Sequence, residues 1–269
     1  MGTAHSKGVK IYYETFGEGP PLLLISGWGA SGLNWEPAFI DALAKAHRVI
    51  VLDNRGTGRS DKPDTKYSIP LMTEDCVAVL DAASAEKPHI LGASMGGLIA
   101  QELALSHSDR VASLILCCTS CGWRGRSPPS QRTFARLFLG DFWKMRAEER
   151  LRLRMEMLFT KEFVSKEWPR LKEHWESLAT HPTPIYAFRR RWEALMNYDC
   201  CNRLQEIRAP TLVMGGDTDQ LNSVERLKEL ADGILGAELQ IYPRLGHGFI
   251  VEAREEVAKR ILLFLEEKD

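Results

Sequence analysis

The stretch HILGASMGG, residues 89–97, places a serine between glycines where a run of aliphatic residues ends and a helical pattern begins. The residues before Ser94 are typical of a buried strand, and apolar residues at helical spacing follow from Met95. Gly92 and Gly96 complete the pattern G-x-S-x-G. An abrupt turn from strand to helix strains the serine backbone and leaves no room for side chains two positions away. The stretch therefore predicts an exposed, nucleophilic serine at the edge of a sheet.

Segments on both sides of this turn alternate between strand and helix patterns. Residues 9–16 are expected to form a hairpin strand, and a Gly/Pro turn then leads to a buried strand at 22–26. Further strands are expected at 48–53, 89–92 and 111–117, with helices at 39–46, 71–83 and 95–107. This alternation predicts an α/β fold whose mostly parallel sheet is covered by helices on both faces.

The alternation stops at residue 122 and resumes after residue 204. The segment between these positions has helical character, and it holds 17 Lys and Arg against 10 Asp and Glu although the whole chain has a net charge of −1. Five of the seven tryptophans also lie there. We therefore expect a helical cap at 122–204, inserted between two parts of one core, 1–121 and 205–269.

In its turn motif and element order the chain resembles the α/β-hydrolase superfamily over nearly its whole length. The resemblance implies a catalytic acid after a late strand and a histidine in the last loop. In TLVMGGDTDQLNS it selects Asp219 over Asp217, which is then expected to structure the loop. In RLGHGFIVE it selects His247. His247 would take the proton of Ser94, and Asp219 would orient the ring and stabilise its charge.

The resemblance also implies an oxyanion hole made by two backbone N–H groups. These belong to Met95, after the serine, and to Trp28 in SGWGAS. The chain has Ser26-Gly27 where relatives commonly have His-Gly. This change keeps the Trp28 amide but leaves open what anchors the loop.

The same loop also matches the dinucleotide fingerprint G-x-G-x-x-G, through Gly27, Gly29 and Gly32. Asp53 ends the next strand about 20 residues later, as a ribose-binding acid would. Pro37 opposes this reading, because it would break a helix that opened at the glycines and suits the first turn of a later helix. We therefore expect Asp53 to structure its turn and the chain not to be an oxidoreductase.

The predicted cap offers two ideas about the substrate. Its aromatic and methionine side chains pack the cap, and some of them should line an apolar pocket for an acyl or alkyl group: Phe134, Phe138, Trp143, Met155, Met157, Phe159, Trp192 and Met196. Arg189, Arg190 and Arg191 lie about 100° apart on a helix, so one of them could bind a substrate carboxylate. Solvated helix faces are the alternative explanation of these charges.

The remaining signals concern location and cofactors. No signal peptide or membrane span is recognised, which favours a cytoplasmic protein with reduced cysteines. MGTAHS fits the N-myristoylation pattern, with an ordinary N-terminus as the alternative. We expect the cysteines of two groups to be small buried residues, with a zinc or redox role as the alternative: Cys117, Cys118 and Cys121, and Cys200 and Cys201. We expect no metal, organic cofactor, nucleic acid or membrane partner.

Together these patterns predict a serine hydrolase that cleaves carboxylic esters or lactones through an acyl-enzyme intermediate. The substrate is a small molecule that could be anionic. A C–C bond hydrolase and a cofactor-free perhydrolase remain alternatives, since relatives perform these reactions with the same three residues. A non-catalytic ligand receptor is the alternative from another class.

Overall fold

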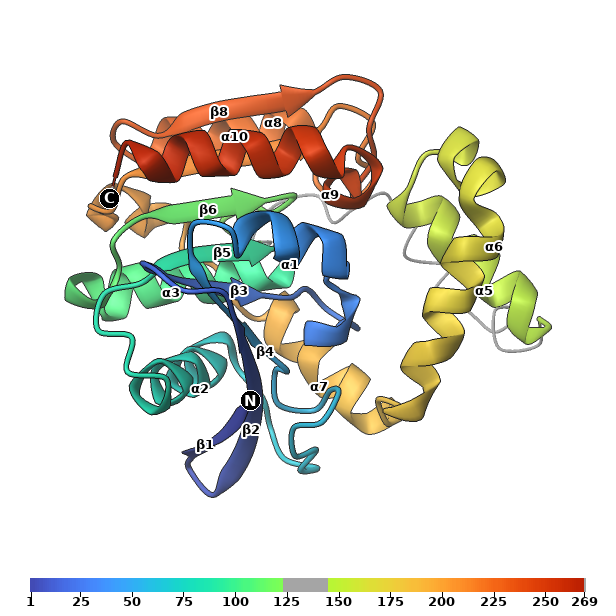
Figure 1. Cartoon of the computed structure of the whole chain (residues 1–269), viewed down its shortest axis with the longest axis horizontal. Helices are drawn as coiled ribbons and strands as arrows, with labels where there is room; N and C mark the ends of the chain where they lie inside the picture. Colours follow the sequence, from blue (N-terminus) through green and yellow to red (C-terminus); the bar gives the residue numbers. More distant parts are fainter. Residues whose placement is uncertain (123–144, 269) are drawn as a thin grey trace.

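An eight-stranded sheet forms the centre of the computed structural model, which describes residues 1–122 and 145–268 (Figure 1). The strand order is β1-β2-β4-β3-β5-β6-β7-β8, and every pair from β4 to β8 is parallel. This architecture confirms the predicted fold class. The strands are β1 Gly2–Ser6, β2 Val9–Phe16, β3 Pro21–Ile25, β4 Arg48–Leu52, β5 His89–Ala93, β6 Leu114–Cys117, β7 Thr211–Gly216 and β8 Glu238–Tyr242.

The first two strands form an antiparallel hairpin that the sequence only half predicts. The strand at 9–16 is confirmed as β2, but its hairpin partner is β1, whose residue Gly2 lies opposite Tyr13. β2 does not pair with β3, because β4 lies between them. The Gly/Pro turn therefore does not close a hairpin; it connects β2 to β3, which lies on the other side of β4 in the sheet.

Two helical layers cover the sheet, and the strands divide their side chains between them. In β3, Leu23 and Ile25 pack into one apolar core and Leu22 and Leu24 into the other, as the two-residue period of a strand requires. The first core includes helices α2 Ile69–Ala82, α3 Met95–Ser106 and α8 Val224–Gly233. The second includes α1 Pro37–Leu43, α9 Phe249–Glu252 and α10 Arg254–Glu266.

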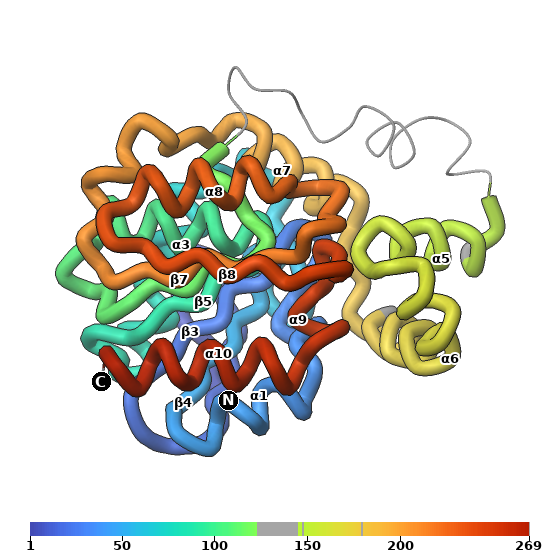
Figure 2. Tube along the Cα trace, turned by 90° about the horizontal axis from the view of Figure 1, so that it is seen from above, coloured from blue at the N-terminus to red at the C-terminus, as the bar shows by residue number. Residues whose placement is uncertain are grey.

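In the described part of the chain between β6 and β7, three α-helices belong to the cap: α5 Ala147–Leu158, α6 Lys161–Ser177 and α7 Ile185–Met196. They lie beyond one edge of the sheet, and α5 and α6 project to one side of the core (Figure 2). Leu151, Met155, Val164 and Leu171 give the cap a small core of its own. The cap boundaries at 122 and 204 stay a prediction, and Phe134, Phe138 and Trp143 lie outside the described residues.

A disulfide joins the two ends of the cap insertion and corrects the expectation that the cysteines are reduced. Cys121, just after β6, is bonded to Cys201, and their Cα atoms lie 4.9 Å apart. The two residues meet because the chain returns from the cap to the point where it left the core, and Gly122 bridges Asp199 beside them. Cys117, Cys118 and Cys200 are buried free thiols.

None of the helices in the described part of the chain has the length and apolar character needed to cross a membrane.

Candidate active site

Ser94 occupies the sharp turn between β5 and α3 that the sequence predicts. Its backbone has φ 54° and ψ −119°, a conformation that side-chain-bearing residues rarely adopt. A Cβ on Gly92 would lie 2.4 Å from the Gly96 oxygen, and one on Gly96 would lie 2.1 Å from the Ile25 oxygen. Glycine is therefore required at both positions, because the helix passes directly against the neighbouring strand ends. The turn holds Ser94 at the carboxyl edge of the sheet.

The loops after β7 and β8 bring an acid and a histidine together. The Nδ1 atom of His247 lies 2.8 Å from Oδ2 of Asp219. The other carboxylate oxygen of Asp219 accepts hydrogen bonds from the backbone N–H groups of Leu221 and Asn222. Asp217 instead accepts the backbone N–H of Arg244 at 2.6 Å. The geometry thus pairs His247 with Asp219 and leaves Asp217 in the adjoining turn.

The electrostatics of this pair raise the pKa of the imidazole relative to that of an ordinary histidine. Only 7% of the His247 surface and 8% of the Asp219 surface are exposed. Burial disfavours the charged ring, but the Asp219 carboxylate, with a smaller contribution from Cys118, outweighs it and raises the pKa of His247 well above its usual range. Because Nδ1 faces Asp219, Nε2 is the ring nitrogen that is left for a substrate or a nucleophile.

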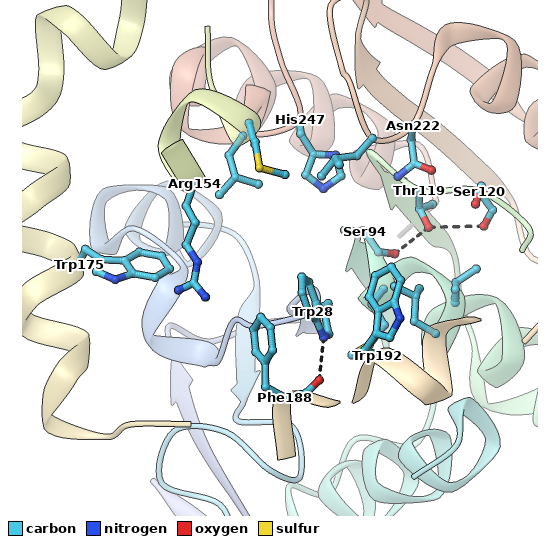
Figure 3. Close-up of a pocket in the computed structure, with 17 residues that line it drawn as sticks. Trp28, Ser94, Thr119, Ser120, Arg154, Trp175, Phe188, Trp192, Asn222 and His247 are labelled. Atoms are coloured by element: carbon cyan, nitrogen blue, oxygen red, sulfur yellow. Dashed lines mark hydrogen bonds between the residues drawn. The ribbon is translucent and has the colours of Figure 1, made fainter. Parts of the chain in front are cut away.

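Ser94 and His247 line two apolar cavities, and Trp28 and Leu158 also line both of them. One cavity, of about 140 Å³, lies under the cap and is shown in Figure 3. The other, of about 170 Å³, lies on the side of Trp35 and Phe39. The cap contributes to the first cavity through α5, α6 and α7, with the residues Arg154, Met157, Leu158, Trp175, Phe188, Trp192 and Leu195. Of the predicted pocket residues, Met157 and Trp192 line it, whereas Met155 packs inside the cap.

The loop that carries Trp28 lies against the serine and is held by the cap helix α7. A Cβ on Gly27 would lie 3.0 Å from the Ser94 Cβ. The Trp28 indole donates to the Phe188 carbonyl at 3.0 Å, and its ring contacts those of Phe188 and Trp192 (Figure 3). The guanidinium of Arg191, from the same helix, donates to two carbonyls of this loop. Met95 begins α3, so the predicted oxyanion-hole residues both lie beside Ser94.

The cap also contacts the loop of the histidine. The N–H of Gly248 donates to the Leu158 carbonyl at 2.6 Å, where α5 ends. Thr160 donates through its hydroxyl to Glu252 at 2.6 Å, and Glu252 also accepts the N–H of Gly246. The two glycines that flank His247 are thus each bonded to the cap or to a residue that binds the cap.

None of the three arginines that were considered as carboxylate ligands is among the residues that line the cavity under the cap. Arg189 is exposed, and Arg190 forms ion pairs with Asp64 and Glu193. Arg191 is buried and bonded to the loop described above. The arginine that lines the cavity is Arg154 of α5, which sequence reasoning missed because it stands among several charged residues of a helix whose inward face only the fold defines.

Arg154 lies between two aromatic rings of the cavity. Its guanidinium carbon is 5.7 Å from the ring centre of Trp175 and 5.6 Å from that of Phe188. Burial, and secondly the neighbouring Arg150, lower the pKa of Arg154. An arginine remains charged at neutral pH, so this wall of the cavity carries a partly desolvated positive charge.

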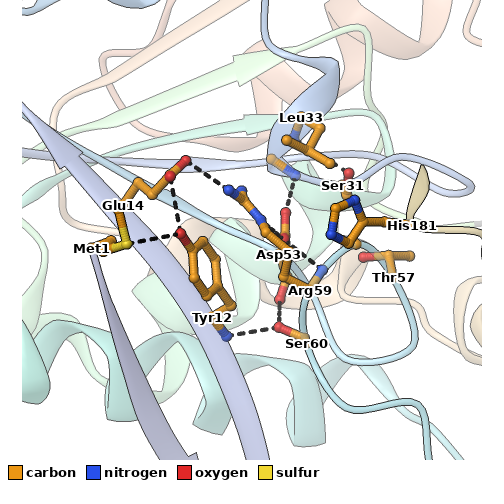
Figure 4. A network of polar contacts seen from close by, with 12 residues as sticks. Met1, Tyr12, Glu14, Ser31, Leu33, Asp53, Thr57, Arg59, Ser60 and His181 are labelled. Carbon is orange, nitrogen blue, oxygen red and sulfur yellow. Dashed lines mark hydrogen bonds and ion pairs between the residues drawn. The ribbon is translucent and has the colours of Figure 1, made fainter. Parts of the chain in front are cut away.

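The glycines of the dinucleotide pattern do not open a helix. Gly32 begins a short 3-10 turn, Gly32–Asn34, and α1 starts afterwards with Pro37 in its first turn. Asp53 is fully buried and accepts hydrogen bonds from the N–H of Gly32 and from Arg59, which extends the network to Glu14 (Figure 4). The expectation that Asp53 structures this turn is confirmed.

Within residues 1–122 and 145–268, no three His, Cys, Asp or Glu side chains are grouped as metal ligands would be. The search included Cys117, Cys118, Cys121, Cys200 and Cys201, and none of them belongs to such a group within those residues.

Comparisons with known proteins place this architecture in a family. The profile of the α/β hydrolase fold matches residues 20–253, so the chain belongs to the α/β-hydrolase family and is a hydrolase. A protein of Azorhizobium caulinodans, provisionally named carbamate hydrolase RutD, is 32% identical over the full length of both chains. The pimeloyl-[acyl-carrier protein] methyl ester esterase of Aeromonas hydrophila is 34% identical over 79% of this chain and 82% of its own. The enol-lactonase of Burkholderia xenovorans LB400 superposes with a TM-score of 0.85 at 25% identity, covering 98% of this chain and 100% of that one.

Proposed function

We propose that the protein is a serine hydrolase that cleaves carboxylic esters or lactones. Ser94 attacks the carbonyl carbon, and Nε2 of His247 takes its proton and returns it to the leaving alcohol. Asp219 holds the ring through Nδ1 and stabilises its positive charge. The backbone N–H groups of Trp28 and Met95 stabilise the oxyanion. Water then releases the acid from the acyl-enzyme by the same steps in reverse order.

One observation carries this proposal: a histidine bonded to a buried carboxylate lines the same cavity as a serine in a strained strand-to-helix turn. A serine hydroxyl is a poor nucleophile at neutral pH, and a neighbouring oriented base is what activates it. The two cavities that meet at Ser94 support a substrate with two parts, an acyl group in one and an alcohol group in the other.

The nature of the leaving group is tested with a substrate panel. We expect wild-type protein to hydrolyse p-nitrophenyl esters or small lactones, and Ser94→Ala to lose at least about 10³-fold of that rate. A carbamate ester belongs in the panel, because a relative that matches over its full length is named for carbamate hydrolysis. A β-diketone tests the C–C bond alternative. Failure of every ester and lactone, with the carbamate or the diketone cleaved, would contradict the proposed bond class.

We also propose that the substrate carries an anionic group, which Arg154 binds. A guanidinium in an apolar wall attracts a carboxylate strongly, because little water screens the charge. We expect Arg154→Met to raise KM for half-esters of dicarboxylic acids about 10- to 100-fold, and to leave neutral esters of equal length within about 2-fold. Arg152→Met, an exposed position on the same helix, is the matched control. Equal effects on charged and neutral esters would refute the role.

A further inference from the structure

Arg191 is a buried cation whose hydrogen bonds all end on one loop. It has no exposed surface, although it belongs to the cap helix α7. Nη2 donates to the Gly27 carbonyl at 2.7 Å, and Nη1 donates to the Ala30 carbonyl at 3.0 Å. Its Nε has no hydrogen-bond partner among the residues that the structure describes, and the Asp53 carboxylate acts on the guanidinium only through its charge. Burying a charge without an ion pair is costly, so this arrangement calls for a reason beyond stability.

The geometry of a peptide group supplies that reason. The Gly27 carbonyl and the Trp28 N–H belong to one planar peptide unit, in which the two bonds point in opposite directions. A donor that fixes the carbonyl therefore also fixes the direction of the N–H. A peptide that turned over would direct its carbonyl oxygen, instead of its N–H, at the developing negative charge.

We infer that Arg191 is a positioning residue for the oxyanion hole: its guanidinium holds the Gly27–Trp28 peptide so that the Trp28 N–H faces the reacting carbonyl. The inference rests on the proposed function. It also answers what anchors a loop that has Ser26 where relatives commonly have histidine. A cation on the carbonyl further polarises the peptide, which makes its N–H a stronger donor.

Other contacts also hold the same loop and limit the expected effect. The Trp28 indole donates to the Phe188 carbonyl, as described above, and the Ser26 hydroxyl donates to the Ala30 carbonyl at 3.3 Å. The Ala30 N–H donates to the Gly27 carbonyl at 3.2 Å, and the Asn54 side chain donates to the Ser26 carbonyl at 3.1 Å. Loss of Arg191 should therefore loosen the peptide without releasing it. Removal of an entire oxyanion donor typically costs about 10²- to 10³-fold in kcat, so a smaller loss is expected here.

The test compares Arg191→Met, which nearly keeps the side-chain volume, with Arg191→Lys, which keeps the positive charge but lacks the rigid, planar fork of donors. Arg189→Met is the control, because Arg189 is the exposed arginine of the same helix. We expect Arg191→Met to lower kcat for a p-nitrophenyl ester about 10- to 100-fold with KM within about 2-fold, and Arg191→Lys to lie between it and wild type. Arg189→Met should behave as wild type.

Binding of a boronic acid, which forms a tetrahedral adduct with an active serine, separates positioning from structural support. Its inhibition constant should rise in parallel with the loss of kcat/KM, while inhibition by the carboxylate product stays unchanged. Circular dichroism checks the fold of each variant, and Arg191→Lys decides the question if Arg191→Met does not fold. Unchanged kcat and boronic acid affinity, or a change in KM alone, would overturn the inference. A wild-type protein that neither cleaves esters nor binds the boronic acid would instead overturn the proposed function.

Discussion

Two aspartates that lie two residues apart after β7 differ in what they bond. Asp219 is buried and faces His247, whereas the exposed Asp217 accepts a backbone N–H in a turn. Both are aspartates of the same loop, yet only Asp219 contacts the imidazole and can shift its pKa. Asp219→Asn and Asp217→Asn are therefore a matched pair of substitutions.

The pH dependence of kcat/KM should report this difference. Because the pKa of His247 is raised and the base must be neutral, we expect the acid limb of wild type to lie above the ordinary histidine value of about 6.5. Asp219→Asn removes the charge that raises the pKa, so the limb should move to lower pH while kcat falls about 10⁴-fold. Asp217→Asn should leave the limb in place. A limb that does not move in Asp219→Asn would contradict this assignment.

At the scale of elements, the cap is tied to the core at its base as well as above the site. The disulfide Cys121–Cys201 closes the insertion where it leaves and re-enters the core, and the two cysteines have a sequence separation of 80. A crosslink over such a loop restricts the unfolded chain, and its removal typically costs about 2–4 kcal/mol.

We therefore expect the double variant Cys121→Ser/Cys201→Ser to have a free energy of unfolding about 2–4 kcal/mol below that of wild type, measured by urea titration. A reductant should lower the free energy of unfolding of wild type to that of the double variant and leave the value of the double variant unchanged. This comparison controls for the effect of the serine substitutions themselves. Wild type that keeps its stability in reductant, with the double variant equally stable, would show that the pair is not crosslinked in solution.

Local patterns predict most of the elements, and tertiary contacts account for what they miss. The strand at 9–16 and the turn at Ser94 follow from residues a few positions apart, so the sequence predicts both correctly. The pairing of β1 and the disulfide depend on how distant segments return to each other, which no local pattern encodes. The row of three arginines was a visible signal, but which of them turns inward, and toward what, depends on the packing of α7.

At the scale of the whole molecule, a parallel sheet gathers residues that are more than 150 positions apart along the chain. The loops after β3, β5, β7 and β8 all leave the same edge, and they carry Trp28, Ser94, Asp219 and His247 respectively. The cap then closes over this edge and bonds to two of these loops, through Arg191 on one side and Thr160 on the other. The site therefore belongs to the core and the cap together.

Reaction with a fluorophosphonate probe, followed by mass spectrometry of the digested protein, tests the central claim most directly. The account predicts one adduct on Ser94 in wild type, no adduct in Ser94→Ala, and labelling slowed by at least about 10³-fold in His247→Ala, because the hydroxyl reacts only when the imidazole takes its proton. A wild-type protein that stays unlabelled, or that labels on another serine at a rate unchanged in Ser94→Ala, would contradict it.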